Sequence, residues 1–175
     1  MSKLVHINHE ALHTIATEVT PKEFTDGTVD KIIKGLKKAI KTYNVKGYVA
    51  VAIAAPQIGV AKRIFMVEDH SSRPEDEKLP TIIAINPKIL KHSKKKKVLD
   101  EGCLSVPDTY GSVERYCNVT FSALNEKGES FTRDTGGLLA QIIQHETDHL
   151  DGILFIDKAV KTWSKPDDES DKNMN

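Results

Sequence analysis

The segment 145–149 reads His-Glu-Thr-Asp-His and lies within an apolar stretch of the chain. Residues four apart share one face of a helix, so a helix here would direct the imidazoles of His145 and His149 at one point. That arrangement suits a single divalent metal, with Glu146 beside it as a general base. The neighbouring positions predict burial: Leu138, Leu139, Ile142, Ile143 and Leu150. Buried polar groups are costly without partners, so the segment predicts a metal site in the core.

A catalytic metal site needs a third protein ligand and one open position. Some proteases with this motif use a histidine six residues later, but Phe155 stands there. Others use a glutamate about twenty residues on, and Glu169 has roughly that spacing, within a polar and charged stretch. Cys103 lies upstream in the segment 101–105, Glu-Gly-Cys-Leu-Ser. A cysteine thiolate is a strong ligand for zinc or ferrous iron, so Cys103 is a further candidate.

The segments 101–105 and 145–149, in this order, resemble the peptide deformylase family. The family has a third pattern, G-x-G-[LI]-A-A-x-Q, and residues 50–57 read Ala-Val-Ala-Ile-Ala-Ala-Pro-Gln at the expected place. Shorter similarities lie at 111–115 and 137–140. The resemblance covers roughly residues 8–160, and three ordered segments are far more specific than any one of them.

The resemblance implies that Cys103, His145 and His149 bind one divalent metal ion. The implied ion is ferrous iron in the cell, with zinc, nickel or cobalt able to replace it. Glu146 would act as a base and then as an acid, handing its proton to the leaving amine. The implied substrate is an N-formyl group on the first methionine of a new polypeptide, and the products are formate and a free amine.

Further roles follow from the same resemblance. The side-chain amide of Gln57 and the backbone N–H of Leu104 would donate hydrogen bonds to the developing oxyanion. Glu101 is expected to accept a hydrogen bond from a ligating imidazole. Arg115 is expected to pair with Asp148 and steady the helix, although a plain surface ion pair explains Glu101 and Arg115 equally well.

The methionine side chain of the substrate needs apolar walls, for which the sequence offers Val51, Leu99, Leu104 and Ile142. Ala50 and Ala52 replace both glycines of the family pattern. Alanine keeps the backbone N–H and C=O groups, but a positive φ would be costly and two methyl groups would narrow the peptide groove. The replacement therefore bears on substrate fit, and a non-catalytic or substrate-altered homologue is an alternative. A zinc endopeptidase with Glu169 as its third ligand is a further alternative. Glu146 argues against a purely structural metal site.

The composition predicts a single globular domain at 1–163, followed by a polar, disordered tail at 164–175. Hydrophobic residues make up 39% and charged residues 29%, and the formal net charge is zero. This balance indicates no direct recognition of nucleic acids and no membrane association. The four lysines at 94–97 are expected to form an exposed turn between strands, in preference to a binding patch. A monomer is expected, with the ribosome as a further candidate partner.

Cysteine usage indicates the compartment. Cys103 and Cys117 are the two cysteines of the chain, too few for a secreted disulfide scaffold. The first residues lack the apolar core of a signal peptide, and no apolar run has the length of a membrane span. These features predict a protein of the cytoplasm.

Periodicity predicts an amphipathic helix over 28–44 with Thr28 as its N-cap, and a metal-binding helix over 136–150 that ends near Gly152. A hairpin turn is expected at 125–128. Strands are expected at several places: 48–54, 63–67, 81–90 with Pro87 at an edge or bulge, and around Val113, Val119, Phe121 and Phe131. The predicted class is α+β, with mostly antiparallel β-sheets packed around a buried C-terminal helix that carries HExxH.

Overall fold

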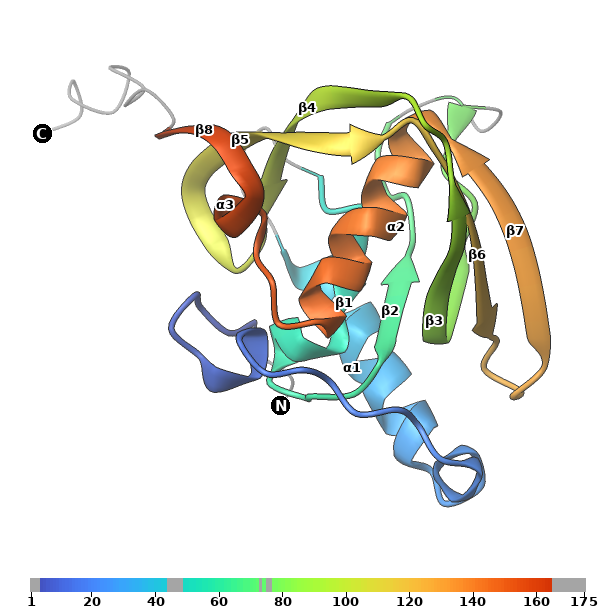
Figure 1. Cartoon of the computed structure of the whole chain (residues 1–175). Coiled ribbons are helices and arrows are strands. Elements are labelled where there is room, and N and C mark those ends of the chain that lie inside the picture. The colour runs from blue at the N-terminus through green and yellow to red at the C-terminus, as the bar shows by residue number, and fades with distance from the viewer. Residues whose placement is uncertain (1–3, 44–48, 73, 75–76, 165–175) are drawn as a thin grey trace, which may run out of the picture.

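Two antiparallel β-sheets enclose a central helix in this computed structural model (Figure 1). The structure describes residues 4–43, 49–72, 74 and 77–164. The five-stranded sheet has the order β1 (Ala52–Ala54), β2 (Ile64–Val67), β3 (Ile82–His92), β6 (Asn118–Leu124) and β7 (Ser130–Gly136). The three-stranded sheet has the order β4 (Lys96–Cys103), β5 (Val106–Tyr116) and β8 (Ala159–Ser164). The α-helices are α1 (Thr28–Thr42), α2 (Gly137–Leu150) and α3 (Phe155–Lys158), and the 3₁₀ turns are η1 (Glu10–Leu12), η2 (Pro21–Phe24) and η3 (Ala55–Ile58).

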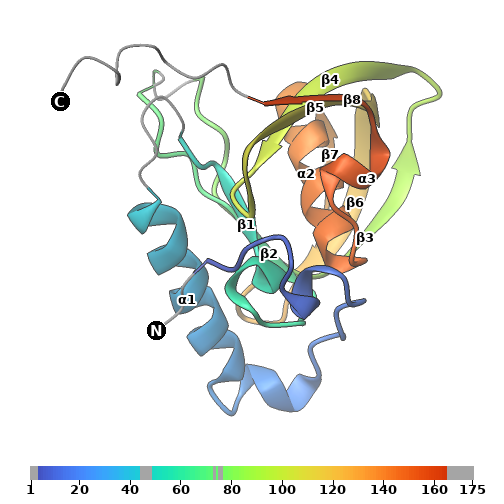
Figure 2. The same ribbon diagram turned by 90° about the vertical axis from the view of Figure 1, so that its left-hand side faces the viewer.

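Both faces of the five-stranded sheet are covered, which explains why β2 is apolar at all four positions (Figure 2). Successive side chains of a strand point to opposite faces. Ile64 and Met66 pack in the cluster that contains the apolar face of α1, whereas Phe65 and Val67 pack in the cluster that contains α2. The sheet therefore separates α1 from α2 and fixes the position of α2 from one side.

The three-stranded sheet closes over α2 from the other side. Arg115 of β5 bonds to Asp148 of α2, and the Tyr116 N–H of β5 donates to the Gln144 side chain of α2. The same sheet contributes Val106 and Val113 to a separate cluster completed by Leu12, Leu154 and Phe155. The α2 helix is consequently buried along most of its length, which confirms the predicted α+β class with a buried C-terminal helix that carries HExxH. None of the described helices is long and apolar enough to cross a membrane.

The predicted N-cap of α1 is wrong by one residue. Gly27 is the N-cap, with φ +84°, and Thr28 is the first helical residue. The side chain of Asp26 accepts a hydrogen bond from the Thr28 N–H at 2.9 Å, which satisfies a donor that the helix itself leaves free. The helix ends at Thr42, and Asn44, the predicted end, lies outside the described residues.

Several strand boundaries differ from the expected ones. The strand predicted at 48–54 is reduced to β1, because only Ala52–Ala54 pair with β2, and Tyr48 lies outside the described residues. The pairing of β3 with β6 shifts register between Ile85 and Lys88, so Pro87 occupies the irregularity predicted for it. The sequence did not predict β8, which reaches Ser164, one residue into the expected tail. Residues 165–175 lie outside the described part of the chain.

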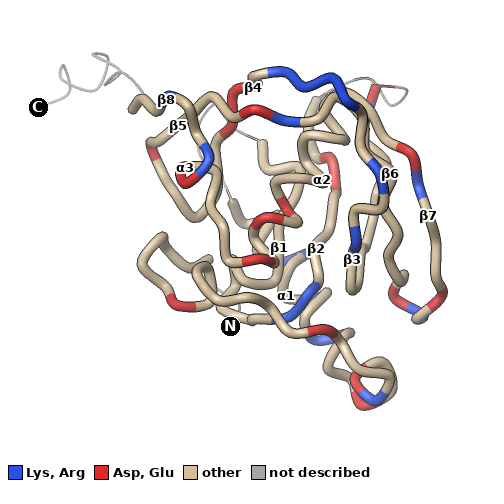
Figure 3. Tube along the Cα trace, in the orientation of Figure 1, with Lys and Arg blue, Asp and Glu red and all other residues tan. Residues whose placement is uncertain are grey.

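The lysine run lies where β3 passes into β4 (Figure 3). All four side chains at 94–97 are exposed, as predicted. The turn itself is shorter than expected, because β4 already begins at Lys96. The hairpin turn predicted at 125–128 joins β6 to β7 and is confirmed.

A comparison of Gly152, which follows α2, with Gly27, which precedes α1, tests whether the close backbone contact at Gly152 requires glycine. Both have positive φ, +74° and +84°, but a Cβ on Gly152 would lie 2.9 Å from the backbone carbon of His13, whereas nothing lies within 4 Å at Gly27. Gly27→Ala should lower the free energy of unfolding by about 1–2 kcal/mol, the cost of a left-handed alanine. Gly152→Ala should lower the free energy of unfolding by about 1–3 kcal/mol more than Gly27→Ala does, because the His13 backbone must move. Urea unfolding of both variants measures this, and equal losses would contradict the close contact.

Candidate metal centre

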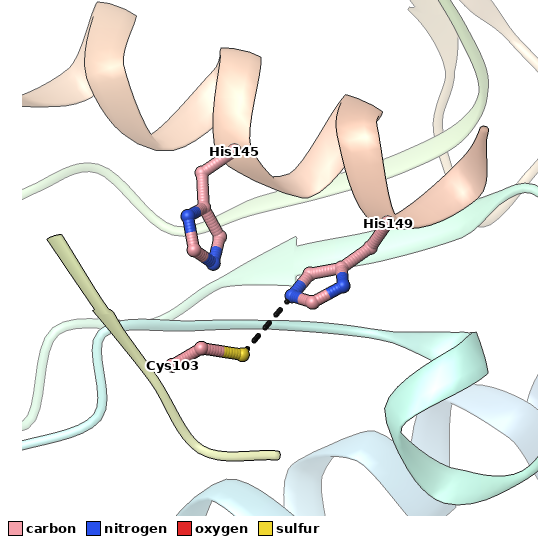
Figure 4. Close-up of side chains that lie close together, drawn as sticks. All are labelled: Cys103, His145 and His149. Atoms are coloured by element: carbon pink, nitrogen blue, oxygen red, sulfur yellow. Dashed lines mark hydrogen bonds between the residues drawn. The ribbon is translucent and has the colours of Figure 1, made fainter. Parts of the chain in front are cut away.

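Three ligand-type side chains converge between α2 and the end of β4 (Figure 4). His145 and His149 lie one turn apart on α2, and Cys103 is the last residue of β4. Their ligand atoms all lie within 4.8 Å of one another, with the Cys103 Sγ 3.3 Å from the His149 Nε2. The helical spacing predicted the meeting of the two imidazoles, and the sheet brings the thiol to them across more than forty residues of sequence.

The turn between β4 and β5 places the thiol. Gly102 pairs with Tyr110, but Cys103 pairs with Val106, so the register shifts at the last residue of the strand. Leu104 and Ser105 form the two-residue connection. The turn fixes the direction of the side chain at a hairpin end, so the Cys103 thiol has a defined position.

Gln57 approaches the same point from η3. Its carbonyl Oε1 accepts a hydrogen bond from the Ala54 N–H at 2.8 Å, and its amide Nε2 donates to the Cys103 Sγ at 3.4 Å. The first bond fixes which way the amide faces, so the N–H groups point toward the metal-ligand cluster. Gln57 is 2% exposed, which excludes the interpretation of a surface amide.

Arg115 is the central cation of a buried ion-pair network beside the metal-ligand cluster. Its Nε and Nη2 donate to both oxygens of Glu101 at 2.8 and 2.9 Å, and its Nη1 donates to the Asp148 Oδ2 at 2.5 Å. The other Asp148 oxygen accepts from the Nζ of Lys158 at 2.7 Å. Arg115 is 3% exposed and Glu101 is 7% exposed, so a plain surface ion pair is excluded.

Glu101 also orients one of the histidines. The His145 Nδ1 donates to the Glu101 Oε2 at 2.9 Å, which leaves the other ring nitrogen for the cluster. Burial raises the pKa of Glu101, but the hydrogen bonds from Arg115 and His145 outweigh it and lower the pKa to about 2. The stability contributed by this carboxylate is therefore present above its ordinary pKa near 4.5 and is lost as the pH falls toward 2.

Glu146 has the opposite electrostatic environment. Burial raises its pKa to about 7, although the charge of His145 acts against the shift. Its Oε2 is buried and has no hydrogen-bond partner within the described residues. A carboxyl group with a pKa near neutrality suits proton transfer at physiological pH.

The side chains fit a divalent metal. One thiolate and two imidazoles are borderline-soft donors of the kind that bind zinc or ferrous iron. The clustering of these donors would allow them to hold one cation, and the Glu146 oxygen without a partner in the described residues is buried beside His145. Burial lowers the pKa of His149, and the neighbouring His145 charge lowers it further, so this ring is neutral and free to coordinate.

A cavity of about 370 Å³ opens onto the cluster. Cys103, His145, Glu146 and Gln57 lie in its wall, so the reactive groups face a space that can admit a ligand. Apolar side chains form much of the remaining lining: Tyr43, Val49, Val51, Leu104, Val106, Pro107, Tyr110, Leu138 and Ile142. Such a mixture of apolar walls with a few convergent polar groups is typical of a small-ligand site.

Comparison with known proteins identifies the family. The model of the polypeptide deformylase family matches residues 1–165. The chain belongs to the polypeptide deformylase family. It is 41% identical over 146 residues to peptide deformylase 1 of Ralstonia nicotianae, covering 83% of this chain and 79% of that protein. It is 42% identical over 148 residues to the peptide deformylase of Pseudoalteromonas translucida, covering 85% of this chain and 80% of that protein.

Solved deformylase structures have the same fold. A class I type b peptide deformylase from Acinetobacter baumannii aligns with a TM-score of 0.78 and 32% identity, covering 89% of this chain and 97% of that one. The peptide deformylase from Thermotoga maritima aligns with a TM-score of 0.78 and 29% identity, covering 92% and 99%. The chain is thus a metal-dependent hydrolase that removes the N-formyl group from the N-terminal methionine of newly synthesised polypeptides. This replaces the endopeptidase alternative, whose third ligand, Glu169, lies outside the described residues.

The alanines that replace the deformylase glycines cause no backbone strain. Ala50 and Ala52 line the cavity, and Ala52 pairs with Val67 in regular antiparallel geometry. The described non-glycine residues with positive φ are Asn86 and Asp108, so neither alanine has a left-handed backbone. Any effect of the alanines must therefore come from their methyl groups.

Leu99 is the one expected pocket residue that does not line the cavity. It lies on β4 four residues before Cys103, which is roughly 13 Å along a strand. The cavity is lined by the segment before β1, by the β4–β5 hairpin from Asp100 onward and by α2, so the part of β4 that carries Leu99 lies outside it.

Three supporting residues were not found from the sequence. Gln141, one turn before His145, donates to the Asp100 carbonyl at 3.0 Å. Gln144 accepts from the Tyr116 N–H and donates to the Tyr116 carbonyl, both at 3.0 Å, and so joins α2 to the end of β5. Two glutamines within an otherwise apolar helical face were an available signal, because buried amides need partners. Lys158, which pairs with Asp148, carried no such signal.

The ion pair of Arg115 should dominate the stability of this deformylase. Arg115→Met should lower the free energy of unfolding by about 3–5 kcal/mol, because Glu101 and Asp148 would be left buried without their cation. Lys96→Met is a suitable control, since it breaks the exposed Lys96–Glu114 pair and should cost less than about 1 kcal/mol. Urea unfolding at neutral pH measures both values, and a loss below about 1 kcal/mol for Arg115→Met would show that the network is not structural.

Proposed function

We propose that Cys103, His145 and His149 hold the single divalent metal of this deformylase, and that Glu146 is its acid–base residue. The observation that carries the proposal is the meeting of three ligand atoms within 4.8 Å beside a buried carboxyl group with an unpaired oxygen. The support is the chemistry of the donors, one thiol and two imidazoles, whose ligand atoms already lie close together. A structural metal site would have no use for Glu146.

Ferrous iron is the proposed ion in the cell, with zinc, nickel and cobalt as ions that the same donors accept. When bound, a divalent cation supplies Lewis acidity, which lowers the pKa of water and polarises a carbonyl group. The thiolate of Cys103 and the hydrogen bond from His145 to Glu101 make the ligand set electron-rich. Metal analysis of protein purified without oxygen would identify the ion.

Glu146 carries the proton in the proposed reaction. As a carboxylate it takes a proton from the attacking water, and it then donates that proton to the amine nitrogen as the formamide bond breaks. The two steps need a group that is a competent base and a competent acid at the same pH. Burial, which raises the pKa of Glu146 to about 7, provides such a group.

Gln57 and Leu104 are the proposed donors to the formyl oxygen. Negative charge develops on this oxygen as water attacks, and fixed donors stabilise it without reorganising. The hydrogen bond from the Ala54 N–H preorganises the Gln57 amide, and the tight turn after Cys103 fixes the backbone at Leu104. Both groups lie in the cavity wall next to the proposed ligands.

The methionine side chain of the substrate is proposed to lie against Val51, Leu104 and Ile142. These residues surround the cavity together with Ala50 and Ala52, which we assign to the walls of the peptide groove. Leu99 is excluded from this assignment because it does not line the cavity. We further propose that the enzyme acts as a monomer, in the cytoplasm, on chains that are still at the ribosome. The free thiols of Cys103 and Cys117 suit a reducing compartment.

The roles of Glu146 and His149 can be separated. Glu146→Gln should lower turnover of a formyl-methionyl peptide by roughly 10²–10⁴-fold while retaining the metal, because the amide cannot transfer the proton. His149→Ala should lose both metal and turnover, because a ligand is removed. Metal content and kcat are measured on the same preparations. Equal metal loss in the two variants would contradict the assignment of Glu146 as a base.

The two alanines predict a narrower substrate range than glycines would allow. Ala50→Gly combined with Ala52→Gly should leave metal content unchanged and lower KM for longer formyl-methionyl peptides relative to the shortest one, because the groove loses two methyl groups. Kinetics on peptides of increasing length compare the variant with the natural chain. Identical profiles for both proteins would show that the alanines are neutral replacements.

A further inference from the structure

Six lysines form one exposed ridge where β3 continues into β4: Lys88, Lys91, Lys94, Lys95, Lys96 and Lys97. The stretch 86–99 contains all six and no aspartate or glutamate. Because the whole chain is formally neutral, a net charge of −6 is left for the other residues. The positive charge of this lysine ridge is therefore balanced by acidic residues elsewhere in the chain (Figure 3).

The ridge follows a continuous edge of the two sheets. β2 pairs only with Ile82–Ile85 of β3, so the second half of β3 has β6 as its single neighbour. β4 is an edge strand of the three-stranded sheet. The backbone that carries these lysines thus has a free edge along one side. Lysines on such an edge also prevent pairing with other chains, which the experiment below distinguishes from binding.

Most of the positive charge on the ridge is not neutralised. Lys96 pairs with Glu114 at 2.7 Å, and Lys88 pairs with Glu18 at 3.2 Å, and all four of these side chains are substantially exposed. Ion pairs in such positions are weak and are easily exchanged for another anion. For Lys91, Lys94 and Lys95 there is no ion pair within the described residues. These three ammonium groups are available to a ligand.

A stacked ring pair lies beside the ridge. The rings of His92 and Tyr116 have centroids 3.7 Å apart at an interplanar angle of 16°, and the Lys96 Nζ lies 4.9 Å from the Tyr116 centroid. His92 is exposed and Tyr116 is half-buried. A flat, solvent-exposed ring next to clustered lysines is the combination that binds single-stranded nucleic acids, in which lysines contact phosphates and rings stack on bases.

We propose that the lysine ridge and His92 form a binding surface for RNA. A curved, narrow row of lysines matches a phosphate backbone, and the stacked rings match an unpaired base. The ridge is separate from the active-site cavity, since none of its residues lines that cavity. Lys97 lies six residues before Cys103 on β4, roughly 20 Å along the strand. The proposal does not depend on the catalytic roles given above.

RNA binding would suit an enzyme of this family. A polypeptide still under synthesis is attached to an RNA-rich particle, so a deformylase reaches its substrate next to an RNA surface. Weak, salt-dependent contacts would raise the local concentration of enzyme without fixing it to one place. The sequence predicted no nucleic-acid recognition because the net charge is zero and because a run of lysines is typical of an exposed turn. Neither feature reflects how charge is distributed in the folded chain.

The test measures binding of the full-length, metal-loaded enzyme to a labelled single-stranded RNA by fluorescence anisotropy at several salt concentrations. Replacing Lys91, Lys94 and Lys95 by glutamine should weaken binding at least about tenfold. It should also reduce the slope of log affinity against log salt by about 2, because each lost phosphate contact on a single strand removes about 0.7. Turnover of a short formyl-methionyl peptide should be unchanged.

The α1 helix offers a matched control. Lys31, Lys34 and Lys38 are equally exposed on its outer face, and glutamine at these positions removes the same total charge. If binding depends on the ridge and not on net charge alone, this variant should keep its affinity within about threefold of the natural chain. Equal weakening by both triple variants would overturn the proposal of a defined surface.

His92 distinguishes base stacking from simple charge attraction. His92→Ala should weaken binding of single-stranded RNA by roughly fivefold or more and leave binding of double-stranded RNA unchanged, because bases within a duplex cannot stack on a side chain. Sedimentation with vesicles containing anionic lipid tests the other polyanion that lysines can bind. The proposal is overturned if the natural chain binds such vesicles and not RNA, or if the ridge variant merely aggregates while its RNA affinity stays the same.

Discussion

The buried guanidinium of Arg115 is the interaction on which the site depends. It comes from β5 and neutralises Glu101 of β4 and Asp148 of α2, so one cation joins the three-stranded sheet to the central helix. Removing charges from water is costly, and this arrangement offsets the cost with a bidentate bond and a second carboxylate. The Glu101 Oε2, which accepts from Arg115, also accepts a hydrogen bond from the His145 Nδ1. The same network that fixes the fold therefore fixes the orientation of a proposed metal ligand.

Two glutamates within this region show how position decides chemistry. Glu101 and Glu146 are both buried, but the cations beside Glu101 lower its pKa to about 2, whereas burial raises that of Glu146 to about 7. The first is a permanent anion that orients an imidazole. The second can gain and lose a proton near neutral pH. The proposed reaction uses both kinds of group, and the fold makes them from one residue type by placing Arg115 and His145 against Glu101.

The molecule also separates its functions in space. The cavity lies between the segment before β1, the β4–β5 hairpin and α2, whereas the lysine ridge follows the passage from β3 to β4. β4 connects the two regions: Lys96 begins it and Cys103 ends it. A chain with zero net charge can in this way present a strongly basic surface at a distance from the reaction it catalyses.

The sequence by itself determined the elements whose residues interact locally. The i, i+4 spacing placed His145 and His149 on one face of α2, because it depends only on neighbouring positions. Three short segments indicated the family, because their residues and their order along the chain can be recognised without the fold. Local pattern alone could not choose between Cys103 and Glu169, and it wrongly placed Leu99 at the pocket. The bidentate Arg115–Glu101 pair, the Gln144 link to β5, β8 and the cavity walls were decided by tertiary structure. They depend on strand register and on contacts between distant segments, which short-range periodicity does not specify.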